Sequence, residues 1–392
     1  MIYKPQPKLQ INIYDAYTLT WKAMLDSAIS FTHRHSWNEI VNSEMKISKT
    51  ATNIQEVQTG RIVVVNNQLD RALVIEEMTA NLVDDYWTVT MIPLKGILNW
   101  RIAHPSDSGT YVARKQADVM MSMIAQNLML QTRDNDRKFW NDNTTRTKNM
   151  ITSATNKTYG ASIDFSVDWK TGYLGDAVIS VSNMYAVGSY PIGWNIYIVP
   201  TMDGYQIDTY QATDRTVNQT TNPTVIFSDD YGNIKDAVYT KSMKDWRNVV
   251  YMQYTDTANA AQSLPVGNTK SGATVGFNRK EITIDSTKNT TPAVGAEGNS
   301  ELNKRQIVDS FTAEILTNPY TMSTYNVNWF LGDIVTIQSR NLKKGELISV
   351  NAQITEVEEV YDQGEYTVSA TFGEGKLTII DLIKNAINAR KL

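Results

Sequence analysis

Two short stretches near the middle of the chain, YQATDRT at residues 210–216 and NPTVIFS at residues 222–228, decide how the fold is interpreted. Asp214 and Asn222 are of residue types that hydrogen-bond to their own backbone and favour turns. Arg215 carries a planar guanidinium that suits a bidentate pair with Asp214 or with another nearby carboxylate. We therefore interpret this motif as a structural network of turn and pairing residues rather than as a ligand site.

Strand-like patterns flank the motif and dominate both ends of the chain. Residues 194–199 and 205–210 are two candidate strands, and Asp203-Gly204 between them is a strong hairpin signal. Further short runs of strand type lie at 11–14, 61–65, 73–78, 87–92, 334–338, 347–360 and 365–372. These patterns predict an α+β protein that is rich in β-structure.

Helical periodicity is confined to three segments. Apolar residues at helical spacing predict helices over 112–128 and 173–187, and an amphipathic helix over 376–392 at the end of the chain. Residues 131–157, 258–276 and 287–300 are rich in polar residues or in Gly, Thr, Asn and Ala, and these segments are predicted to be loops, the last one a linker.

Composition narrows the function classes. The 392 residues carry a formal net charge of -4, so the basic excess typical of proteins that grip nucleic acid is absent. The absence of Cys excludes disulfides, cysteine nucleophiles and thiolate metal sites. No run of about 18 apolar residues predicts a membrane span, and the first residues do not resemble a signal peptide.

No catalytic, cofactor-binding or metal-binding constellation is predicted. His33 and His35 would share one face of a strand, but no third ligand is visible nearby, so a structural pair is expected. Asp134, Asp136 and Asp142 lack the Gly and Glu of a calcium-binding EF-hand loop and are expected to be solvated. Phosphate-loop, dinucleotide-binding and nucleophile-elbow motifs are all missing.

The chain resembles a known family in the central motif and in further stretches nearer its two ends. FLGDIVT at residues 330–336 is followed by AQITEV at 352–357 and VSATFG at 368–373, and a weaker match covers residues 72–101. The central motif itself continues through YGNI at residues 231–234 and Tyr239 to DWRNVV at residues 245–250. Together, these stretches resemble the tail-hub, or tail-associated (Tal), proteins of long-tailed phages with non-contractile tails. The matched motif positions are Asp214, Arg215, Asn222, Pro223, Phe227, Asn233 and Asp333. The sequence departs from the family between residues 284 and 308.

The resemblance implies a fold like the baseplate hub of contractile-tailed phages, with two β-barrel domains and inserted α/β segments. The expected domains are an N-terminal barrel at 1–104, an α/β insert at 105–200, a motif-bearing segment at 201–310, a C-terminal barrel or meander at 311–375 and a helix at 376–392. Relatives often continue into a fibre or a murein hydrolase. Because this chain ends 19 residues after Gly373, a hub alone is expected.

The resemblance also implies partners and a location. A homotrimer would cap the tail tube at the virion tail tip, after synthesis in the host cytoplasm, and dock on the distal tail protein ring. It would adjoin the tail tube, the tape-measure protein and the receptor-binding proteins of the baseplate. Genomic DNA would pass through it without sequence-specific binding. The protein would gate DNA ejection, and it would not be an enzyme.

Two other hypotheses remain open. A host-adsorption protein would use exposed Tyr and Trp side chains to stack on cell-wall sugars, and the chain has 20 Tyr and 9 Trp. A cell-wall hydrolase needs only two carboxylates, and 41 acidic residues leave room for such a pair.

Overall fold

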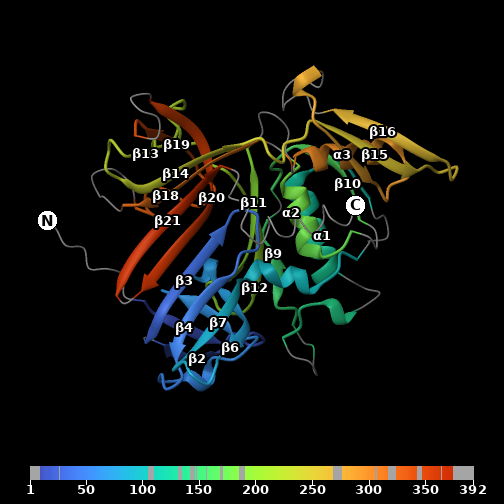
Figure 1. Cartoon of the computed structure of the whole chain (residues 1–392). Helices are drawn as coiled ribbons and strands as arrows, with labels where there is room; N and C mark the ends of the chain where they lie inside the picture. Colours follow the sequence, from blue (N-terminus) through green and yellow to red (C-terminus); the bar gives the residue numbers. More distant parts are fainter. Residues whose placement is uncertain are drawn as a thin grey trace. The chain divides into compact units, whose positions relative to one another are not determined.

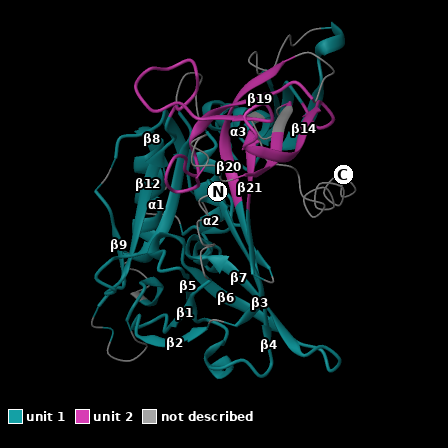
Figure 2. Ribbon diagram, turned by 90° about the vertical axis from the view of Figure 1, so that its left-hand side faces the viewer, with its two compact units in different colours: residues 1–213, 247–306, 358–367 teal, residues 214–246, 307–357, 368–392 magenta. Residues whose placement is uncertain are grey.

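The fold is described from a computed structural model of the chain. Its described residues are 9–25, 27–104, 110–130, 135–141, 146, 148–155, 157–167, 171–184, 190–267, 276–303, 305, 307–316, 324–341, 347–362 and 364–373. The chain divides into two units, each built from several segments (Figure 2). Unit 1 comprises residues 1–213, 247–306 and 358–367, and unit 2 comprises residues 214–246, 307–357 and 368–392.

The N-terminal strands of unit 1 confirm the β-rich prediction for the first hundred residues (Figure 1). They are β1 (Ile11–Tyr14), β2 (Trp21–Leu25), β3 (Ala28–Ser36), β4 (Ser43–Ser48), β5 (Ile62–Val65), β6 (Leu73–Thr79) and β7 (Tyr86–Pro93). Their order in the sheet is β3-β4-β7-β6-β5-β1-β2, with antiparallel pairing throughout. Apolar side chains that alternate along these strands, such as Met45 and Ile47 on β4, are fully buried.

A second part of unit 1 combines helices with small sheets. Its elements are β8 (Thr110–Lys115), α1 (Gln116–Leu128), β9 (Ile151–Ser153), β10 (Ser162–Ser166), α2 (Leu174–Ser182), β11 (Ile192–Ile198) and β12 (Tyr205–Gln211). The predicted hairpin is confirmed, since β11 and β12 pair antiparallel around residues 202–204. The predicted start of the first helix is wrong: residues 110–115 form β8, which pairs with β10, and the helix begins at Gln116.

In the third part of unit 1, two segments that were predicted to be loops form regular elements. Residues 258–276, expected to be a loop, include β16 (Ala261–Gly267), which pairs with β15 (Val249–Thr255) beside β17 (Glu281–Asp285). Residues 287–300, expected to be a linker, mostly lie in α3 (Thr291–Asn303), which packs on this sheet. An added Cβ at Gly298 would lie 2.9 Å from a Val266 methyl, so this glycine permits close approach of helix and sheet.

Unit 2 is built from β13 (Ile226–Ser228), β14 (Ile234–Ser242), β18 (Val308–Ile315), β19 (Ile334–Ser339) and most of β20 (Ile348–Asp362) and β21 (Glu365–Gly373). β14, β18 and β21 are successive antiparallel neighbours, whereas β13 and β19 pair in parallel. Phe227 packs against Trp329 and Phe372 at ring-centroid distances of 5.5 and 5.2 Å, and all three are fully buried. This aromatic cluster forms the core of unit 2.

Short 3₁₀ helices connect some of these elements: η1 (Ile54–Glu56), η2 (Leu69–Arg71), η3 (Leu94–Trp100), η4 (Asn135–Arg137) and η6 (Gly276–Asn278). In the described part of the chain, no helix has the length and hydropathy needed to cross a bilayer. The predicted helix at 376–392 lies outside the described residues. The two-barrel architecture and the division into five domains stay predictions.

Candidate functional site

The central motif forms a hydrogen-bonded network in unit 2. The Arg215 Nε donates to Asp333 Oδ2 at 2.8 Å, and the Arg215 backbone N–H donates to the Ile334 carbonyl at 2.8 Å. The partner of Arg215 is therefore Asp333, on the second motif, rather than Asp214. Asp333 is 4% exposed and also accepts the Phe330 N–H at 2.9 Å. Burial raises the pKa of Asp333, although this N–H and the Arg215 guanidinium both oppose that shift.

The other motif residues hold turns and core contacts. Asp214 accepts the Thr216 N–H through its side chain, and the Asn222 side chain donates to the Asp214 carbonyl at 2.9 Å. Asn233 accepts the Ser228 N–H at 2.7 Å and donates to the Ile226 carbonyl at 2.8 Å. Phe227 lies in the aromatic core and Pro223 is exposed. The structure thus joins Asp214, Asn222, Arg215 and Asp333 by one set of contacts, whereas Asn233 acts in a separate turn.

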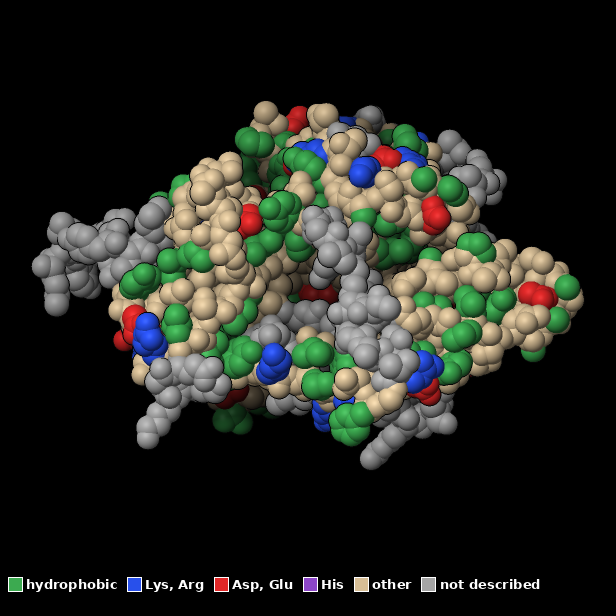
Figure 3. All heavy atoms as spheres, turned by 90° about the horizontal axis from the view of Figure 1, so that it is seen from above, with side chains coloured by type: hydrophobic (Ala, Val, Ile, Leu, Met, Phe, Trp, Pro, Cys, Tyr) green, Lys and Arg blue, Asp and Glu red, His purple; other side chains and the backbone are tan. Residues whose placement is uncertain are grey.

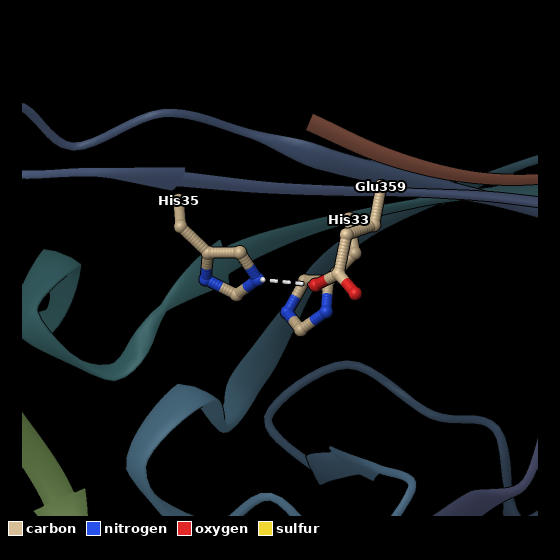
Figure 4. Close-up of side chains that lie close together, drawn as sticks. All are labelled: His33, His35 and Glu359. Carbon is tan, nitrogen blue, oxygen red and sulfur yellow. Dashed lines mark ion pairs between the residues drawn. The ribbon is translucent and has the colours of Figure 1, made fainter. Parts of the chain in front are cut away.

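A second polar cluster lies in unit 1, where strand β3 runs beside the end of β20 (Figure 4). We call His33, His35 and Glu359 the histidine–glutamate cluster. Both rings come from one face of β3, as alternation predicts, and their centroids are 3.9 Å apart. All three residues are buried, with exposed fractions of 1%, 7% and 3%.

The glutamate of this cluster is held by several donors. Arg71, at the end of η2, forms a buried salt bridge with Glu359 Oε2, and Tyr366 donates its hydroxyl to Oε1 at 2.6 Å. The His35 Nε2 lies 3.5 Å from Oε2, too far for a strong hydrogen bond. Burial lowers the pKa of both imidazoles well below 6.5, so both rings are neutral at pH 7. Among the described residues of unit 1, the two neutral imidazoles and the carboxylate form a group that can hold a metal ion.

Sequence reasoning missed Glu359 because it lies more than 320 positions from the histidines. Only the pairing of β20 with β3 brings the three side chains together. Of the aspartates considered for calcium, Asp136 pairs with Arg146, whereas Asp134 and Asp142 lie outside the described residues.

Unit 1 also contains a pocket of about 490 Å³, a size typical of small-ligand sites. Ile62, Val74, Leu94 and Ile97 contribute apolar surface to it. Its lining further includes the aromatic residues Tyr17, Trp100, Phe139, Trp140 and Tyr205, the cations Arg101, Lys138 and Arg146, and the carboxylate Asp136, which pairs with Arg146. Aromatic faces beside cations suit a sugar ring that carries anionic groups.

Solved structures share this fold. The 43 kDa tail protein of prophage MuSo2 from Shewanella oneidensis aligns with a TM-score of 0.52 at 10% identity, covering 93% of this chain and 97% of its own. The prophage tail protein gp18 from Listeria monocytogenes EGD-e gives 0.51 at 10% identity, with 98% and 100% covered. The tail protein from Neisseria meningitidis MC58 gives 0.52 at 10% identity, with 93% and 96% covered.

A search of curated proteins finds no match. The family profile described as "Siphovirus ReqiPepy6 Gp37-like protein" matches residues 10–374. This match confirms the resemblance to a siphophage family, and the chain shares its fold with phage tail proteins. Because the match spans nearly the whole sequence, the chain belongs to the Siphovirus ReqiPepy6 Gp37-like protein family.

Proposed function

We propose that the chain is a hub subunit of a siphophage tail tip, which assembles as a homotrimer at the end of the tail tube. The observation that carries this proposal is the family match over residues 10–374, together with a fold shared over nearly the full length of prophage tail proteins. The buried Arg215–Asp333 network supports it, because this network joins the two sequence motifs on which the resemblance rests.

In this proposal the trimer docks on the distal tail protein ring and contacts the tail tube, the tape-measure protein and the receptor-binding proteins of the baseplate. DNA would cross it without being gripped. The formal net charge of -4 supports this. On the face drawn in Figure 3, the described Lys, Arg, Asp and Glu side chains are scattered among uncharged ones.

Native mass spectrometry of the purified chain, alone and with the distal tail protein of the same phage, tests the proposal. We expect a species of three times the chain mass of 44.2 kDa, and a larger complex when the ring is added. A chain that stays monomeric at every concentration and never binds the ring would contradict the hub role.

A second candidate function is adsorption to an anionic cell-wall glycan, which the aromatic and cationic pocket of unit 1 favours. Titration of intrinsic Trp fluorescence with fragments of the host wall polysaccharide tests it. Binding should be lost in Trp140→Ala and kept in Tyr231→Ala, which removes an aromatic ring that is 51% exposed in unit 2. Unchanged fluorescence at saturating glycan would eliminate this function.

We also propose that the protein catalyses no wall cleavage. The family and fold are those of structural tail proteins, which agrees with a non-enzymatic role. A zymogram on host peptidoglycan checks this, and a clear lysis band at the mass of the chain would overturn it.

A further inference from the structure

The histidine–glutamate cluster contains two buried ring nitrogens that lack a hydrogen-bond partner. These are the His33 Nδ1 and the His35 Nε2, and both are shielded from solvent. Buried polar atoms in native proteins are nearly always paired with protein groups, water or an ion. Two orphaned nitrogens that lie beside one carboxylate therefore suggest that a partner belongs between them.

The tautomer of His33 fixes which of its nitrogens has a free lone pair. Its Nε2 lies 3.2 Å from the Arg71 carbonyl oxygen, which can only accept a hydrogen bond. The Nε2 must therefore carry the proton, and in the neutral ring the Nδ1 is left with a lone pair. A histidine that donates one ring N–H to a backbone carbonyl while the other nitrogen stays free has the arrangement that metal ligands commonly show.

We propose that His33 Nδ1, His35 Nε2 and a carboxylate oxygen of Glu359 bind one divalent transition-metal ion, with Zn²⁺ as the best chemical match. Two imidazoles and one carboxylate, with water in the fourth position, are a common Zn²⁺ ligand set. The nitrogen ligands disfavour Ca²⁺ and Mg²⁺, which prefer oxygen.

The spacing of the three side chains suits this ion. Their candidate ligand atoms all lie within 4.8 Å of one another. Tetrahedral Zn²⁺ with bonds of about 2.0–2.2 Å places its ligand atoms about 3.4 Å apart, so modest side-chain rotations are enough to close the site. The close-up shows His35 and Glu359 facing each other, with the His33 ring beside the carboxylate (Figure 4).

Two nearby cations, Arg71 and Lys95, oppose binding of a metal ion to the histidine–glutamate cluster. The Arg71 guanidinium pairs with Glu359 Oε2, so the bound ion shares this carboxylate with a positive charge. Lys95 is a second cation that acts on His35, and burial lowers its pKa to about 7. Tyr366 holds the other oxygen of Glu359 in place. Removal of the Arg71 charge by Arg71→Met should tighten Zn²⁺ binding by about tenfold or more.

The bound ion would cross-link β3 to the end of β20 within unit 1. This role is independent of the hub proposal, because it concerns the stability of one subunit. Since the ligands must be unprotonated imidazoles and a carboxylate, binding should weaken as the pH falls.

The test uses the full chain, stripped with EDTA and titrated with ZnCl₂ against a competing indicator dye, and with CoCl₂ for its visible spectrum. We expect one ion per chain and Co²⁺ absorption bands that EDTA abolishes. His33→Gln, His35→Gln and Glu359→Gln should each weaken binding by about 100-fold or more. His104→Gln and Glu358→Gln are matched controls that should bind like the unmodified chain. Few other side chains can contribute nitrogen or sulfur ligands to the titration, because the sequence holds only 3 His and 0 Cys.

Two results would overturn the proposal. One is an unmodified chain that competes for no Zn²⁺ and gives no Co²⁺ bands, a readout that does not depend on any variant being folded. The other is unchanged Zn²⁺ affinity in His33→Gln and His35→Gln variants whose circular dichroism matches that of the unmodified chain.

Discussion

Two adjacent glutamates on β20 should respond to the same substitution in opposite ways. Glu359 is 3% exposed and pairs with Arg71, whose side chain is 8% exposed. Its neighbour Glu358 forms a surface pair with Arg34, with side-chain exposures of 30% and 45%. Substitution by Gln removes the charge from either residue while keeping its size, so the comparison isolates the effect of burial.

The magnitudes follow from the surroundings of each pair. Glu359→Gln leaves the buried Arg71 charge without its carboxylate, which should cost about 3–5 kcal/mol of folding free energy. Gln keeps an oxygen that accepts from Tyr366, so that contact is retained. Glu358→Gln should cost about 1 kcal/mol or less, because solvent screens the surface pair. At about 2 °C per kcal/mol, the buried variant should lower the Tm of unit 1 by about 6–10 °C.

Differential scanning calorimetry in EDTA measures both variants without interference from metal ions. The double variant Arg71→Met/Glu359→Gln should recover about 2 kcal/mol relative to the sum of the single variants, because it removes the stranded charge. Equal losses at Glu358 and Glu359, or strict additivity in the double variant, would refute the reasoning from burial.

Three further predictions concern packing and pH, each measured by denaturation of the full chain. Trp329→Ala removes a fully buried ring from the core of unit 2 and should cost about 3–5 kcal/mol. Gly193→Ala should lower the free energy of unfolding by about 1–3 kcal/mol, because the added Cβ would lie 2.5 Å from the Trp37 ring. Gly295→Ala in α3 should raise it by about 0.5–1 kcal/mol, because no atom would lie closer than 3.9 Å to the added Cβ. The pKa values of His33 and His35 are lowered in the folded state, so the unfolded state binds more protons below pH 6.5. The free energy of unfolding should therefore decrease as the pH decreases below 6.5, by up to about 2.7 kcal/mol per pH unit for the two residues. A variant with both histidines replaced by Gln should lose this slope, and an equally steep profile in that variant would contradict the assignment.

Local sequence patterns correctly predicted the elements that depend mainly on the propensities of neighbouring residues. The alternating strands of the first hundred residues and the hairpin around Asp203-Gly204 needed only β-propensity and turn chemistry, and both are confirmed. The pairing of His33 and His35 on one strand face also followed from alternation alone.

Contacts with residues distant in the sequence determine the elements that local patterns predicted wrongly. Residues 110–115 have helix-compatible spacing, but they form a strand because β10 pairs with them. The helix α3 contains Gly295 and Gly298, residues that disfavour helices, and it forms against the apolar face of the sheet of β15, β16 and β17. Glu359 and Asp333 lie far along the chain from their partners, so no local pattern connects them to His33 or to Arg215.

A cryo-electron microscopy reconstruction of the phage tail tip tests the hub proposal most directly. We predict three copies of this chain around the tail axis, between the distal tail protein ring and the outside of the particle. A reconstruction with the chain absent from the tip, or present there in a copy number other than three, would contradict the proposal.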